Sequence, residues 1–166
     1  MLFSEIVGLE DTKQTLINSV RNNHVAHAQL FLGHDGSANL AMALAYATYL
    51  NCEDKGETDS CGKCGSCSKM AKLVHPDLHF LFPVAGKIEE KGSARAELMT
   101  NWRGFVQEMP YAGVQDWSTF AGVDNKQMSI AVDEVRDMIK DLSLKAFEGT
   151  YKEVIMWQPH MKAAAP

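Results

Sequence analysis

The sequence contains no long apolar run and no leader-like N-terminus. No stretch of about 18 apolar residues occurs, so a membrane-spanning helix is not predicted. The first residues, MLFSEIVGLED, lack the basic and apolar regions of a secretory signal. We therefore expect a cytoplasmic protein with no membrane partner.

Positive charge is also scarce. The chain has 16 Lys and Arg residues against 21 Asp and Glu, a formal net charge of −5. Tight binding to nucleic acid needs a basic surface, so this chain alone is not predicted to be a strong nucleic-acid binder. It can still belong to an assembly whose other subunits carry the positive charge. Its 166 residues, 46% apolar and 22% charged, are sufficient for one ordinary globular domain.

Cysteine is confined to one short segment, residues 51–68, which is rich in Gly and charge and is predicted to lack a regular element. The four cysteines, Cys52, Cys61, Cys64 and Cys67, have the spacing C-x8-C-x2-C-x2-C. Four thiolates at about 2.3 Å suit tetrahedral zinc, and such clustering in a reducing compartment favours metal over disulfides. Four protein ligands leave no open position, so the predicted zinc module is structural. The alternatives are an iron–sulfur cluster, a disulfide pair or free thiols.

Apolar periodicity predicts three helices and three buried strands. The helices are expected at 9–22, 38–50 and 132–144, and the strands at 28–32, 78–82 and 152–157. Strands that alternate with helical segments indicate a parallel sheet with crossover connections.

The composition changes between Ala85 and Lys126, and we interpret residues 85–126 as an insertion that is part loop and part helix. The segment contains Trp102, Tyr111 and Trp117. Its charge is acidic as often as basic, so these aromatic residues are predicted to pack in a core and not to stack on bases.

The stretch GHDGSANLA lies between the first expected strand and the second expected helix, where a phosphate-binding loop G-x-x-x-x-G-K-[ST] would lie. Gly33 matches the first glycine, and Gly36 fits a frequent inner one. Ala38 replaces the second glycine, Asn39 the lysine and Leu40 the hydroxyl residue. Taken alone, so degenerate a match is weak, and the stretch is better explained as a Gly-rich turn between a strand and a helix.

The end of the third expected strand lacks acidic residues as well. Phosphate-loop nucleotidases place an acidic pair there for magnesium and the attacking water. Here the strand YKEVIM is followed by Trp157 and Gln158. A site without lysine, hydroxyl or carboxylates is predicted not to hydrolyse nucleotide, and no ATP cofactor is expected. Weak anion binding by helix amides stays open.

Several segments, in order, resemble the AAA+ domain of bacterial DNA polymerase III clamp-loader subunits, most closely the delta-prime type. These segments are FSEIVGLEDTKQTL, HAQLFLG, the four-cysteine module, HPDLHFLFP and IAVDEVRDMIKDLSLKAFEGTYKEVIM. The resemblance covers most of the chain outside residues 85–126. It implies a phosphate-loop-type, three-layer α/β fold with a parallel sheet and a small inserted zinc module. It also implies that the zinc ligands of that family are Cys52, Cys61, Cys64 and Cys67.

The same resemblance implies a function. In that family the gamma/tau subunits hydrolyse ATP, and delta-prime is a non-hydrolysing partner that, with delta, helps to place the sliding clamp on primed DNA. Asn39, Leu40, Trp157 and Gln158 favour the delta-prime type. The alternatives are an ATP-hydrolysing gamma/tau-type subunit and an unrelated zinc-stabilised interaction module. Because further strands, a lid and a collar are expected after MKAAAP, we expect residues 1–166 to be the N-terminal part of the domain.

Overall fold

The fold is described from a computed structural model that places residues 1–86, 93–124 and 126–161. The start of the expected insertion, residue 125 and the last five residues lie outside the described part. The chain divides into two compact units, which are considered separately. Unit 1 comprises Met1–Leu78 and Ala146–Glu153, and unit 2 comprises His79–Lys145 and Val154–Pro166. Among the described residues, no helix is long and apolar enough to cross a membrane.

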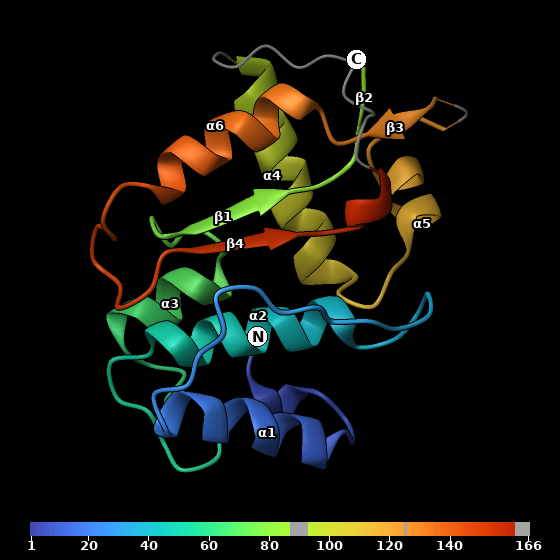
Figure 1. The fold of residues 1–166 in the computed structure, drawn as a ribbon. Helices are drawn as coiled ribbons and strands as arrows, with labels where there is room; N and C mark the ends of the chain where they lie inside the picture. Colours follow the sequence, from blue (N-terminus) through green and yellow to red (C-terminus); the bar gives the residue numbers. More distant parts are fainter. Residues whose placement is uncertain (87–92, 125, 162–166) are drawn as a thin grey trace. The chain divides into compact units, whose positions relative to one another are not determined.

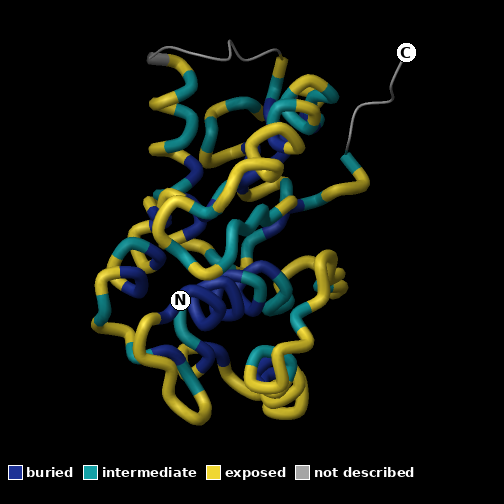
Figure 2. Tube along the Cα trace, turned by 60° about the vertical axis from the view of Figure 1, so that its left-hand side comes forward, coloured by how far each residue is buried: buried dark blue, intermediate teal, exposed yellow. Residues whose placement is uncertain are grey.

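Unit 1 is built around one buried helix. Its elements are the 3-10 turn η1 (Phe3–Glu5) and the helices α1 (Glu10–Arg21), α2 (Asn39–Asn51) and α3 (Gly65–Ala71). The predicted helices at 9–22 and 38–50 are thus confirmed. Helix α2, NLAMALAYATYLN, is apolar on nearly every side and is buried along most of its length (Figure 2). Phe3, Ile6, Leu16 and Ile17 pack against it from η1, the following turn and α1. This packing forms the core of the unit.

The prediction of a buried strand at 28–32 is wrong. Residues 28–32 form no strand, and Leu30 and Leu32 are 77% and 87% exposed. Of these residues, Phe31 is partly buried and its ring lies against Tyr46 of α2, while the side-chain amide of the exposed Gln29 donates to the Tyr46 hydroxyl. The local pattern is that of a strand, but a strand also needs a neighbour, and no described residue pairs with this backbone.

Segment 51–68 is also more regular than predicted, because α3 begins at Gly65 within it. The helix starts there because its first amides find acceptors. The Cys64 thiol accepts from the amide of Cys67, and the Glu53 carboxylate accepts from the amide of Ser66. Helix N-termini leave such amides without intrahelical partners, so these two acceptors act as caps.

Unit 2 contains the paired strands. Its helices are α4 (Ser93–Glu108), α5 (Val114–Phe120) and α6 (Val132–Leu142), followed by the turn η2 (Pro159–Met161). Its strands are β1 (Leu78–Leu81), β2 (Val84–Ala85), β3 (Met128–Ser129) and β4 (Glu153–Met156), with the first residues of β1 and β4 assigned to unit 1. The strands expected at 78–82 and 152–157 are confirmed as β1 and β4.

Strands β1 and β4 are neighbours and run in the same direction (Figure 1). The amide of Glu153 donates to the Asp77 carbonyl, and the amide of Trp157 donates to the Leu81 carbonyl; both N···O distances are 2.8 Å. The equal step of four residues along both strands is that of a parallel ladder. Parallel pairing and the mixed α/β character are therefore as expected. The short β2–β3 pair is antiparallel and was not predicted.

Side chains of β1 alternate between two helices. Phe80 and Phe82 contact Trp102 of α4, whereas Leu81 packs with Met138 of α6. Successive strand residues point to opposite faces, so α4 and α6 cover opposite faces of the pair. Unit 2 is consequently a helix–sheet–helix sandwich.

The segment expected to be an insertion supplies much of this core. Trp102 and Trp117 are fully buried, and their rings lie edge to face with 5.3 Å between centroids. Trp102 also stacks on Phe82 at 4.0 Å, and the Trp117 indole donates to the Pro83 carbonyl. The packing role predicted for the tryptophans is confirmed, while Tyr111 is 38% exposed.

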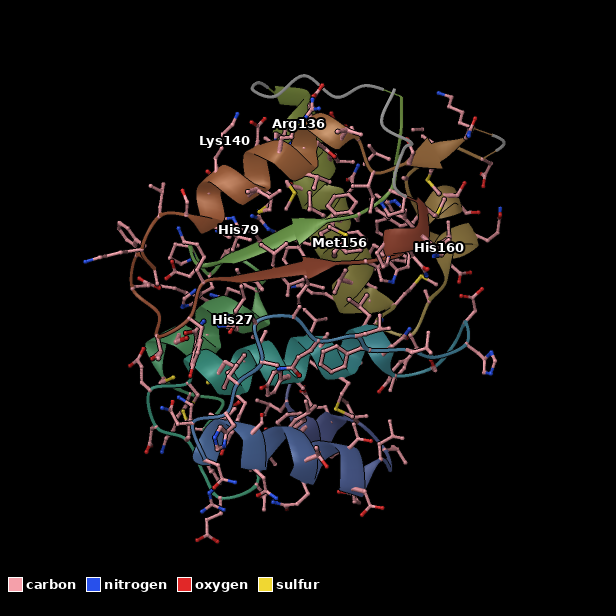
Figure 3. All side chains as sticks on the ribbon, viewed as in Figure 1. His27, His79, Arg136, Lys140, Met156 and His160 are labelled. Atoms are coloured by element: carbon pink, nitrogen blue, oxygen red, sulfur yellow. The ribbon has the colours of Figure 1, made fainter. Side chains whose placement is uncertain are left out.

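Helix α6 confirms the amphipathic helix predicted at 132–144, although it ends at Leu142. Its buried side is narrow, since Met138 is buried but Ile139 is 62% exposed. The basic side chains of Arg136 and Lys140 lie on its outer side (Figure 3), bonded to Asp133 and Asp137 respectively. Each cation thus has an acidic partner three residues earlier, so this face of the helix is of mixed charge.

Candidate functional site

The four cysteines converge in unit 1. Cys52 follows α2, Cys61 and Cys64 lie in the connecting loop, and Cys67 is in the first turn of α3. Their sulfur atoms all lie within 4.8 Å of one another, and the Cys61 and Cys67 sulfurs are 3.9 Å apart. Tetrahedral thiolates around zinc, with bonds of about 2.3 Å, have their sulfurs about 3.8 Å apart. The structure therefore brings together all four predicted ligands in a group that could hold a metal ion.

Backbone amides surround the sulfurs. The amides of Cys61, Cys64 and Cys67 donate to the sulfurs of Cys52, Cys61 and Cys64 in turn, each at 3.3 Å. Amide donors of this kind stabilise negative sulfur and fix the direction of its lone pairs. None of the four cysteines is in a disulfide.

The protonation of these thiols differs with their surroundings. Amide donors, those of Lys63 and Cys64, lower the pKa of the Cys61 thiol to about 7. Burial raises the pKa of the Cys52 and Cys67 thiols above the usual range. A divalent cation between the sulfurs would supply the positive charge that buried thiolates need. The candidate ligand group consists of four sulfur atoms, supported by backbone amides, and includes no oxygen or nitrogen ligand. This donor set fits a structural metal.

The loop from Gly33 to Leu40 is closed by its own side chains. The Ser37 hydroxyl donates to the His34 carbonyl at 2.6 Å and to the Asn39 side-chain oxygen at 3.2 Å. A β-carbon placed on Gly33 would lie 2.2 Å from the Ser37 oxygen, so this hydroxyl covers Gly33 directly. Gly36 has φ +82°, a conformation that favours glycine.

The two residues at the lysine and hydroxyl positions of the loop begin α2. Asn39 is its first residue and Leu40 is its second. Leu40 is 4% exposed, so its side chain is part of the hydrophobic core. Neither residue offers a cation or a hydroxyl to a phosphate.

Trp157 and Gln158 follow β4 in unit 2, whereas the loop belongs to unit 1. Trp157 is 6% exposed, and its ring centroid is 5.3 Å from that of Trp102 and 5.9 Å from that of Phe105. Gln158 has φ +57°, a left-handed turn conformation. The position where an acidic residue would lie is thus part of the aromatic core of α4 and α5.

Sequence reasoning missed a carboxylate cradle at Asp77. This side chain is fully buried and accepts hydrogen bonds from the amides of Phe147, Glu148 and Gly149 at 2.5, 2.9 and 2.7 Å. Burial opposes its charge, but the three amides outweigh burial and lower the pKa of Asp77. Asp77 belongs to the HPDL segment, which the resemblance to clamp-loader subunits includes. Its carboxylate fixes a loop 70 residues further along the chain.

A second, half-buried acid, Glu153, lies beside this cradle. The Asn51 amide donates to one oxygen of Glu153 at 3.2 Å, and the other oxygen is buried without a partner among the described residues. Burial, aided by the negative charge of Asp77, raises the pKa of Glu153 to about 9. Glu153 is therefore neutral in the folded protein at pH 7.

Comparison with known proteins places this arrangement in a family. A family model described as DNA polymerase III, delta subunit matches residues 8–165. The chain belongs to this family. The resemblance to clamp-loader subunits that the sequence suggested is therefore confirmed.

Individual relatives of this DNA polymerase III family match a shorter stretch. DNA polymerase III subunit delta' of Bacillus subtilis is 35% identical over 68 residues, which is 41% of this chain and 20% of the relative. Subunit delta' of Escherichia coli is 32% identical over 74 residues, 45% of this chain and 22% of the relative. Subunit tau of B. subtilis is 32% identical over 65 residues, 39% of this chain and 12% of the relative. The matched stretch spans about a fifth of the delta' relatives.

The raised pKa of Glu153 predicts how stability changes with pH. The folded protein keeps the Glu153 proton up to about pH 9, whereas the unfolded chain, with a pKa near 4.5, releases it earlier. The contribution of Glu153 to stability is therefore fully present below about pH 4.5 and is lost as the pH rises through 9. Glu153→Gln, which cannot ionise, should be more stable than the wild type by about 1–3 kcal/mol at pH 9. Denaturant unfolding at pH 5, 7 and 9 measures this difference.

The matched control is Glu97→Gln, which makes the same substitution at an exposed position. It should retain the wild-type pH dependence. Parallel pH profiles for the wild type and Glu153→Gln would contradict a buried neutral acid.

Proposed function

We propose that this chain is part of a non-hydrolysing AAA+ subunit of the bacterial clamp loader, of the delta-prime type. Its function is to hold the gamma/tau and delta subunits in an assembly that places the sliding clamp on primed DNA in the cytoplasm. The family match supports a clamp-loader subunit, and relatives of both the delta' and the tau type are found. The choice between the delta-prime and gamma/tau types depends on which residues occupy the glycine loop at 33–40 and the end of β4.

One observation carries this choice. The residues at two positions where nucleotide chemistry would be expected have become core residues: Leu40 in unit 1 and Trp157 in unit 2 are 4% and 6% exposed. A lysine, a hydroxyl and an acidic residue act on phosphate and magnesium only from a polar, accessible site. Asn39 carries no positive charge, and the Ser37 hydroxyl is bonded within the loop to His34 and Asn39. These features support a subunit that leaves hydrolysis to its neighbours.

The proposal predicts no ATP turnover by the full-length protein alone. Mixed with the gamma/tau and delta subunits, it should co-elute in one complex and raise the turnover that the sliding clamp and primed DNA stimulate. Steady-state phosphate release and size-exclusion chromatography measure the two effects, with gamma/tau alone as the positive control. Turnover by the isolated protein would favour the gamma/tau-type alternative. Failure to join the complex would favour an unrelated interaction module.

The metal is proposed to be structural zinc, held by Cys52, Cys61, Cys64 and Cys67. Metal analysis should find about one zinc per chain, because four thiolates close the tetrahedral site. Cys64→Ala removes a ligand and a helix cap together. It should weaken zinc binding by more than the roughly 10–100-fold that loss of an outer-shell partner costs. Far-UV circular dichroism should also show a loss of helix.

The control for this prediction is Ser68→Ala, an exposed change next to Cys67. It should retain both zinc and helix content. Iron in place of zinc, or no bound metal, would overturn the assignment.

A further inference from the structure

The loop between the first two cysteines holds the N-terminal segment of the protein. In this loop, one oxygen of the Asp59 carboxylate accepts from the amide of Phe3 at 3.0 Å, and the other accepts from the amide of Ser4 at 2.8 Å. The same carboxylate accepts from the amide of Ser60, next to Cys61. Asp59 is thus bonded at once to the cysteine loop and to a segment 55 residues earlier in the chain.

A second contact joins the same two segments. Gly62, in the turn between Cys61 and Cys64, has φ +68°. A β-carbon placed on it would lie 3.3 Å from the Cδ1 atom of Leu2, so the Leu2 side chain packs over this turn. The contact is apolar and is independent of the Asp59 hydrogen bonds.

Tyr49 of α2 connects the two segments as well. Its hydroxyl donates to the Gly56 carbonyl in the cysteine loop at 3.2 Å, and its ring lies 5.9 Å from that of Phe3. The amide of Gly56 in turn donates to the Asp59 carbonyl at 2.9 Å. The loop that carries Asp59 is therefore attached to the core at Gly56.

The N-terminal segment itself determines how α1 begins. Phe3 and Ile6 are 1% and 2% exposed, and the ammonium group of Lys13 in α1 donates to the Ile6 carbonyl at 2.6 Å. The segment 1–6 thus contributes Phe3 and Ile6 to the core of unit 1 and is bonded to the first turns of α1.

We propose that Asp59 is a positioning residue through which metal binding orders residues 1–6. The eight residues between Cys52 and Cys61 contain no helix or strand, so their conformation depends on how their two ends are held. A metal bound by both flanking cysteines closes this loop and places the Asp59 carboxylate under the amides of Phe3 and Ser4. By linkage, the docked N-terminal segment strengthens metal binding by the same factor. The inference rests on the metal site proposed above.

Hydrogen exchange measured by mass spectrometry tests the proposal in the zinc-loaded protein. Chelation of zinc should speed exchange of the peptide that covers residues 2–6 by about tenfold or more, since it loses two bonds to a charged acceptor. Asp59→Asn should produce a comparable increase while the metal is still bound. It should also weaken zinc binding about tenfold, measured by competition with a chromogenic chelator. Leu2→Ala, which removes the apolar contact over Gly62 and keeps the Asp59 carboxylate, should give a smaller change in the same direction.

The matched control is Glu57→Gln, which removes one negative charge from an exposed position in the same loop. It should leave both the exchange rate and the zinc affinity unchanged. One zinc per chain, with N-terminal exchange unaffected by chelation and by Asp59→Asn, would overturn this inference and leave the metal centre intact. Absence of any bound metal would overturn both.

Discussion

Burial of α2 is the constraint on which the rest of unit 1 depends. Because the helix is covered on nearly every side, it is held in place, and so are the segments that precede it, follow it and pack against it. At its start, Leu40 enters the core directly after the glycine loop. Near its middle, Tyr46 contacts Phe31. At its end, Asn51 exchanges two hydrogen bonds with the backbone of Tyr151, and Cys52 follows as the first sulfur of the cluster. One apolar helix thereby positions the glycine loop, the metal ligands and the chain that returns before β4.

In unit 2, buried aromatic side chains have the role that the buried helix α2 has in unit 1. The strand pair is covered on one face by α4, and Trp157 at the end of β4 joins Trp102 and Phe105 there. Aromatic rings in mutual contact add to the stability that their buried area alone provides. In both units, therefore, a position where a nucleotidase would need a polar group contributes to hydrophobic stability. This packing supports the proposal of a subunit that keeps the fold of its family without the chemistry.

Local patterns in the sequence predicted what depends on local geometry. Apolar periodicity located α1, α2, α6, β1 and β4, and short cysteine spacings predicted the sulfur cluster because two-residue gaps let thiols converge. Features that depend on distant partners could not be predicted in this way. The short apolar run at 28–32 predicts a strand, but it has no described partner strand. The Asp77 cradle joins residues at least 70 positions apart, and Glu153 is neutral only because of what surrounds it. The packing role predicted for Trp102 and Trp117 is confirmed, whereas Tyr111 is exposed, and the core that the two tryptophans share with other elements could only be seen in the structure.

The most direct test of this account is to restore the missing groups together, as Asn39→Lys, Leu40→Thr and Trp157→Asp in the full-length protein. Because Leu40 and Trp157 are core positions, the triple variant should lose stability. Truncation of a buried tryptophan alone costs about 3–5 kcal/mol, and burial of a carboxylate adds to that. Chemical unfolding and ATP binding are measured on the same preparation, with Trp157→Phe as the conservative control. The account predicts a destabilised variant that gains no ATP binding or turnover. A variant of wild-type stability that binds and hydrolyses ATP would contradict it.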